Sequence, residues 1–162
     1  MKNNKGMSYI ELILVISIAL ILTGIGTFSY GMIRRTNISK AADKTISKIN
    51  EARSLALVKG TDRGIIAFTN KSGSIYCYVG DDFDSIDMDK QNWEKICVKP
   101  VTMSVTDKAG STAELGEGGV VKTKFKQSTG EVTEGTIRMI YKTSKSSVGV
   151  KIYKATGKPV LD

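Results

Sequence analysis

The 162-residue chain contains no histidine and only two cysteines, Cys77 and Cys97. Without histidine, neither a Ser-His nor a Cys-His nucleophile pair can form, and a zinc site made of cysteine and histidine cannot be drawn. These kinds of site are excluded, and our expectation for the chain is a protein without catalytic residues, cofactor or metal site. Hydrophobic residues make up 41% of the chain, so it can bury a core and does not have the composition of a disordered protein.

The excess of positive charge is unevenly distributed along the chain, whose formal net charge is +8. Residues 1–60 contain nine Lys or Arg against three Asp or Glu, a net charge of +6. The remaining 102 residues carry 15 basic and 13 acidic side chains, a net charge of +2. The high isoelectric point is therefore not in itself an argument for nucleic-acid binding.

Charge is absent from the 22 residues between Leu12 and Ile33. As a helix this run would be about 33 Å long, enough to cross the hydrocarbon core of a bilayer. An ordinary secretory signal is cleaved after its apolar region, beside small residues, but here Arg34 and Arg35 follow directly. One alternative is a simple N-terminal membrane anchor.

Glu11 is a carboxylate inside this apolar N-terminal segment. Burying a charged side chain in a bilayer costs about 2.5–3.5 kcal/mol on insertion scales, so such a residue usually has a partner. Cleavage after Gly6 would create an α-amino group at Met7 and make Glu11 the fifth residue of the mature chain. In a filament, the amine of one subunit could then meet the carboxylate of a neighbour. The alternative is a glutamate held near the lipid headgroups.

Residues 5–12, with the sequence KGMSYIEL, resemble the type III signal of type IV prepilins. This resemblance implies a leader peptide over 1–6, which a prepilin peptidase removes between Gly6 and Met7, followed by N-methylation of Met7. It also implies that residues 7–33 cross the membrane and later lie in the filament core, and that Glu11 serves assembly. Met7 stands where the family most often has phenylalanine.

The same resemblance implies a location and a set of partners. The precursor would be a single-pass protein of the cytoplasmic membrane with its C-terminal domain outside. After processing it would join other pilin subunits in a helical filament, extracellular or periplasmic.

A helical pattern continues past the uncharged run. Its apolar positions recur at spacings of three and four: Ile38, Ala42, Ile46, Ile49, Ala52 and Ala56. This pattern predicts that residues 34–60 form an amphipathic half of the helix, packed on a domain. Lys59 and Gly60 supply a stop signal.

Beyond Gly60 the period changes to two, which predicts an antiparallel β domain over residues 61–162 and an α+β fold class. The predicted strands are 64–69, 74–79, 95–98, 120–126, 135–141 and 148–153, with a turn at 70–73.

Segments of the last 40 residues look like the tail of H-type minor pseudopilins and related minor pilins. These segments are 125–130, 135–137, 150–152 and 156–158. The resemblance implies a β-sandwich of two sheets and a minor, rather than major, subunit.

Five aspartates occur within nine residues, from Asp81 to Asp89. Alternating acidic side chains on a loop can bind Ca²⁺. However, the segment lacks the glycine and the terminal glutamate of an EF-hand, so a solvated loop is the favoured interpretation and Ca²⁺ the alternative.

Cys77 and Cys97 lie on two predicted strands. Outside the cell two cysteines in a small domain often pair, and closing such a loop would stabilise the fold by about 3 kcal/mol. The alternative is two buried thiols that act as small core residues.

Lys122, Lys124 and Lys126 alternate with apolar or small residues, so on a strand they share one face. Residues 122–158 contain nine basic side chains and only two acidic ones, Glu131 and Glu134. A solvated strand face is the simpler interpretation. Contact with the phosphates of DNA is the alternative, because minor pilins of the resembling group include DNA-uptake components.

The sequence therefore predicts a structural subunit of a type IV pilus-like or type II secretion-like filament. The rivals are a DNA-uptake minor pilin and, from a different class, a membrane-anchored β domain that never assembles.

Overall fold

The structure is a computed structural model that describes residues 8–58, 64–80 and 92–162, without the side chains of residues 25–34. The chain divides into two compact units, Met1–Thr36 and Asn37–Asp162. The second unit is called the head below. One helix, α1 (Tyr9–Val58), contributes to both units.

The first half of α1 has an apolar and exposed surface. Its large hydrophobic side chains from Tyr9 to Leu22 are 45–79% exposed. The hydroxyls of Ser17 and Thr23 donate to the carbonyl oxygens of Ile13 and Ala19, so the helix itself satisfies these polar groups. This surface therefore presents few hydrogen-bonding groups to water.

Among the described residues, no helical stretch is both long and apolar enough to cross a bilayer. The predicted span from Leu12 to Ile33 includes residues 25–33, whose side chains lie outside the description.

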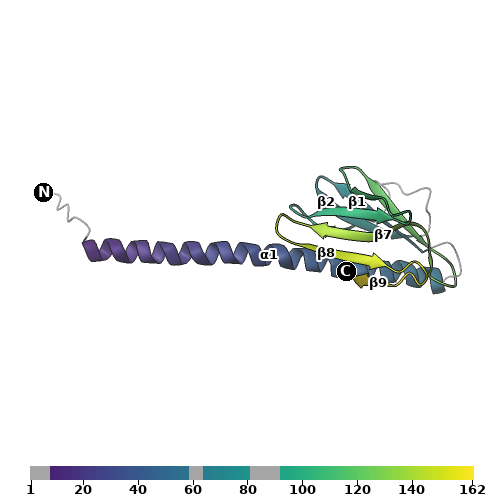
Figure 1. Cartoon of the computed structure of the whole chain (residues 1–162), viewed down its shortest axis with the longest axis horizontal. Helices are drawn as coiled ribbons and strands as arrows, with labels where there is room; N and C mark the ends of the chain where they lie inside the picture. Colours follow the sequence, from purple (N-terminus) through teal and green to yellow (C-terminus); the bar gives the residue numbers. More distant parts are fainter. Residues whose placement is uncertain (1–7, 59–63, 81–91) are drawn as a thin grey trace. The chain divides into compact units, whose positions relative to one another are not determined.

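Within the head, the second half of α1 lies along the sheet (Figure 1). The predicted apolar stripe is buried at Ile38, Ala42, Ile49, Ala52 and Ala56, and Ile46 is partly buried. The small alanines let the helix approach closely: a Cβ added at Gly64 would clash with the Cβ of Ala56. Polar contacts add to this packing, because the Thr45 and Tyr141 hydroxyls are hydrogen-bonded at 2.5 Å.

In the described part of the head, nine antiparallel strands accompany the helix. They are β1 (Ile65–Lys71), β2 (Ser74–Gly80), β3 (Glu94–Cys97), β4 (Thr102–Asp107), β5 (Thr112–Glu114), β6 (Val120–Phe125), β7 (Val132–Lys142), β8 (Ser147–Ile152) and β9 (Pro159–Leu161). The strand order is β3-β2-β1-β6-β7-β4-β5, and β8 pairs with both β7 and β9. The α+β class and the antiparallel head are thus confirmed, and the arrangement is consistent with a pilin-like fold.

β7 joins the two halves of the curled sheet. Its first residues pair with β6, from Val132 to Gly135, and its later residues pair with β4 and β8. The change of partner occurs at Gly135, whose φ is 95°. A Cβ at this position would clash with the carbonyl oxygen of Lys122, so the close approach of β6 also requires glycine. The two sheets expected of a sandwich therefore share one strand.

The predicted turn between β1 and β2 is a two-residue connection. Ser72 and Gly73 both have positive φ, 53° and 72°, as a type I′ hairpin requires. This turn fixes the register in which Phe68 faces Cys77, and both side chains are buried in the core.

Candidate functional site

The described part of the N-terminal segment begins at Ser8, so the predicted cleavage site at Gly6 and Met7 lies outside the described residues. Ser8 and Glu11 form the start of α1. The backbone N–H of Ser8 donates to Oε2 of Glu11 at 3.4 Å, and the N–H of Leu12 donates to the carbonyl oxygen of Ser8 at 3.0 Å. This is the glutamate half of a capping box, S-x-x-E, in which the third helical residue reaches back to the N-cap.

Glu11 therefore has a partner within its own chain. The carboxylate also lies in the first turn, where the helix dipole favours negative charge. Among the described residues this is the hydrogen bond that its carboxylate accepts, which leaves oxygen lone pairs for a further donor. The sequence contained this signal, because Ser8 stands three residues before Glu11 ahead of an apolar run.

β6 carries the predicted lysine face. Thr123 and Phe125 are buried beneath it, while Lys122 and Lys124 are partly buried on the opposite side of the strand and Lys126 is exposed just beyond its end. The strand thus places Lys122 and Lys124 on the side opposite to the buried Thr123 and Phe125.

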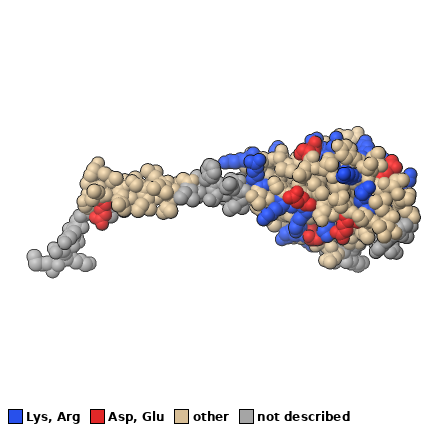
Figure 2. All heavy atoms as spheres, turned by 90° about the horizontal axis from the view of Figure 1, so that it is seen from below, with Lys and Arg blue, Asp and Glu red and all other residues tan. Residues whose placement is uncertain are grey.

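The two acidic residues of this region lie against the lysine face. Glu134 is the register partner of Lys124 on β7, and Oε2 of Glu131 lies 4.0 Å from Nζ of Lys126. A cavity of about 490 Å³ opens beside these residues. More generally, Figure 2 shows basic and acidic side chains interspersed over the visible side of the head. The face is therefore less basic than its sequence suggests.

Cys77 and Cys97 lie on neighbouring strands and are both buried free thiols. Cys97 faces Ile75, two residues before Cys77, so the cysteines are diagonal neighbours in the register of β2 and β3. Burial raises the pKa of Cys77 to about 12 and that of Cys97 to about 11. Neither thiol is therefore activated as a nucleophile near neutral pH.

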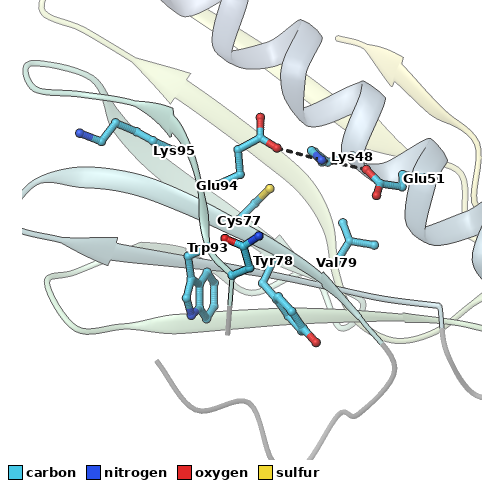
Figure 3. Close-up of a pocket in the computed structure, with 9 residues that line it drawn as sticks. Lys48, Glu51, Cys77, Tyr78, Val79, Trp93, Glu94 and Lys95 are labelled. Atoms are coloured by element: carbon cyan, nitrogen blue, oxygen red, sulfur yellow. Dashed lines mark hydrogen bonds and ion pairs between the residues drawn. The ribbon is translucent and has the colours of Figure 1, made fainter. Parts of the chain in front are cut away.

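A groove between α1 and strands β2 and β3 is lined by the charged residues Lys48, Glu51, Glu94 and Lys95, shown in Figure 3. The volume of this groove is about 470 Å³. Nζ of Lys48 lies 2.8 Å from Oε2 of Glu51 and 2.9 Å from Oε2 of Glu94. Nζ of Lys44 lies 3.5 Å from the other oxygen of Glu94. We call Lys44, Lys48, Glu51 and Glu94 the ion-pair cluster; it connects the edge strand β3 to the helix.

The cluster favours the charged forms of Lys48 and Glu94. The hydrogen bond to Glu51, followed by that to Glu94, raises the pKa of Lys48, and the hydrogen bond from Lys48 lowers the pKa of Glu94. Both shifts move the pKa away from neutrality, whereas an acid or base catalyst needs a pKa near the working pH. The arrangement is suited to holding β3 in place, with Tyr78 and Trp93 packed alongside at a ring-centroid distance of 5.8 Å.

The aspartates from Asp81 to Asp89, the predicted alternative Ca²⁺ site, lie outside the described residues. Over the remainder of the chain that the structure describes, no three His, Cys, Asp or Glu side chains gather as metal ligands would.

Comparison of the chain with models of protein families, with characterised proteins and with solved structures found no match.

Proposed function

We propose that this chain is a structural subunit, and more specifically a minor one, of a type IV pilus-like or type II secretion-like filament. The observation that carries the proposal is the division of α1. Its first half exposes large apolar side chains over residues 9–22, and its second half buries an apolar stripe in the head. A helix that is apolar around its surface needs lipid or other helices around it. A membrane supplies the lipid before assembly, and a filament core supplies the helices afterwards.

In this proposal a prepilin peptidase cleaves between Gly6 and Met7 and the new amine of Met7 is methylated. The subunit waits in the cytoplasmic membrane with its head outside, and then enters a filament with other pilins. Glu11 accepts the Met7 amine of a neighbouring subunit. The lone pairs left by the capping hydrogen bond from Ser8 support this role, because one carboxylate can accept several donors.

Cleavage at Gly6 provides the direct test. Replacing Gly6 with Leu should leave full-length precursor in the membrane, because the peptidase would have to accept a bulky residue at the cleavage site. Gly24→Leu is the matched control, since a Cβ at position 24 meets no atom within 4 Å. The measurement is intact mass of membrane and filament fractions. Filament protein that begins at Met1 would overturn the proposal.

A second candidate is a DNA-uptake minor pilin. The observation that favours it is that Lys122 and Lys124 lie on one side of β6. The carboxylates of Glu131 and Glu134 beside this face favour the structural subunit instead.

A further inference from the structure

A second groove lies between α1 and the edge strand β3 and shares Lys95 with the groove of Figure 3. It has a volume of about 390 Å³ and is lined by Asn37, Lys40, Lys44 and residues 95–98. Ile96 and Cys97 are 7% exposed, and Val98 beside them is 46% exposed. The groove thus combines an apolar floor with a cationic side formed by the helix.

We call this second groove the lysine groove. The positive charge of its helical side comes from Lys40 and Lys44 of α1. Lys40 is exposed, and its ammonium makes no hydrogen bond or ion pair with the described residues. Nζ of Lys44 donates to the carbonyl oxygen of Lys95 at 3.1 Å and shares Glu94 with Lys48. The ammonium of Lys95 lies 5.5 Å from the centre of the Tyr76 ring. No carboxylate lines the groove, so no lining residue repels an anion, and Lys40 offers the anion its ammonium.

The positions of Asn37 and Lys40 in the sequence indicate which kind of anion can reach the groove. Asn37 is four residues beyond Ile33, where the uncharged run ends. Four residues span at most about 14 Å even when fully extended, and Lys40 is about 10 Å beyond Ile33 along a helix. If the uncharged run lies in the bilayer, this short length of chain keeps Asn37 and Lys40 within reach of the lipid headgroups.

We propose that this groove binds the headgroup of an anionic phospholipid. The phosphate is held by Lys40 and Lys44, and the glycerol and upper acyl carbons lie against Val98. Phosphate oxygens suit ammonium donors, and apolar carbons suit the floor. A neighbouring subunit would have to supply both features from one surface segment, whereas a phospholipid carries them in one molecule. The inference rests on the proposed function, since it needs the apolar half of α1 in a membrane.

The test uses the full chain in nanodiscs of phosphatidylcholine with 30% phosphatidylglycerol. Native mass spectrometry after release from the disc counts the lipids that remain bound. The wild type should retain phosphatidylglycerol in preference to phosphatidylcholine. Lys40→Gln should lower that preference about fivefold, since a lysine near an anionic surface contributes about 1 kcal/mol. Val98→Ser should lower it about twofold without changing charge, because apolar contact is lost. Lys142→Gln, an exposed lysine on β7, is the matched control and should change nothing.

Three results would overturn the inference. The first is unchanged phosphatidylglycerol retention in both Lys40→Gln and Val98→Ser. The second is an equal loss in Lys142→Gln, which would indicate general attraction by surface charge. The third is unchanged lipid retention combined with poor filament entry of Lys40→Gln, which would assign the groove to a second copy of the chain. Alkaline extraction of the wild type separates the two proposals: a chain that washes off the membrane contradicts the proposed function, and one that stays in but shows no groove-dependent preference contradicts the lipid site alone.

Discussion

Thr45 and Tyr141 illustrate what residue-level patterns reveal and what they miss. The apolar stripe of α1 was predictable because its members recur at helical spacing. Thr45 was not assigned to it because threonine is polar, yet it is fully buried with Tyr141. Its hydroxyl donates to the carbonyl oxygen of Ala41 at 2.9 Å and meets the Tyr141 hydroxyl. Such a pairing depends on a partner 96 residues away, which a local sequence pattern cannot contain.

The two thiols give a prediction at the same scale. Burial raises their pKa values to about 12 and 11, whereas unfolded thiols ionise near pH 8.5. Their contribution to stability is therefore complete below about pH 8.5 and is lost as pH rises toward the folded values. Between pH 7 and 9.5 the free energy of unfolding in urea with reductant should fall by about 1 kcal/mol per thiol.

The matched variant is Cys77→Ala/Cys97→Ala, which should remove this part of the pH dependence. Alkylation in urea without reductant tests the alternative of a disulfide. Two modified cysteines per chain identify free thiols, whereas an unmodified chain would show that the pair is oxidised in the native protein.

At the scale of elements, strands in which several apolar residues are buried are predictable from the sequence, whereas short or largely polar strands are not. The prediction covered β1, β2, β3, β6, β7 and β8 but missed β4, β5 and β9. β4 buries only Met103 and Val105 among Thr and Ser neighbours, and β5 is exposed along its whole length. β9 is three residues long and begins with Pro159. β4 pairs with β7, β5 with β4 and β9 with β8, so each strand depends on the hydrogen-bonding edge of a neighbour, which is tertiary information.

Gly135 supports a prediction about the strand that joins the sheet. Gly135→Ala should destabilise the head through both its positive φ and the clash with the backbone of Lys122. Gly110→Ala is the matched control, because Gly110 has a φ of 96° but open space around its Cβ. The control should cost about 1–2 kcal/mol from backbone strain alone, and Gly135→Ala clearly more. Urea unfolding of the two variants measures the difference; equal losses would show that close approach of β6 is unimportant.

At the scale of the whole molecule, Glu11 separates an assembling subunit from a membrane-anchored domain. Glu11→Ala should enter membranes as well as the wild type or better, because a costly charge is removed, but should enter filaments at least tenfold less. Glu11→Gln distinguishes the two roles of the side chain, since glutamine can still complete a capping box but cannot form an ion pair with an amine.

The ratio of filament to membrane protein is the measurement for both variants. Failure of Glu11→Gln to assemble would support pairing with the Met7 amine. Normal assembly of Glu11→Gln would assign Glu11 to helix capping, and normal assembly of Glu11→Ala would contradict both roles.

The DNA alternative also concerns the whole molecule. If Lys122, Lys124 and Lys126 contact phosphates, affinity for duplex DNA should fall with salt by about 0.9 log units per contact and decade. We expect binding by the full chain in detergent to be weak, because Glu131 and Glu134 lie against the lysine face. Tight, salt-sensitive binding that is lost in Lys122→Ala/Lys124→Ala/Lys126→Ala, but kept in Lys142→Ala/Lys145→Ala/Lys151→Ala, would favour the DNA-uptake function.

The contacts of α1 within the head join residues that the ribosome makes at widely separated times. Nε of Arg53 donates to the carbonyl oxygen of Thr156, 103 residues later, and the Thr45 hydroxyl is hydrogen-bonded to that of Tyr141, 96 residues later. The ribosome therefore delivers the helix long before the strands that cover it. Over that interval the alanine-rich face of α1 is open to proteases and to other nascent chains. A protein of this design gains from synthesis next to a membrane or a chaperone that shields the helix until residues 141–156 have emerged.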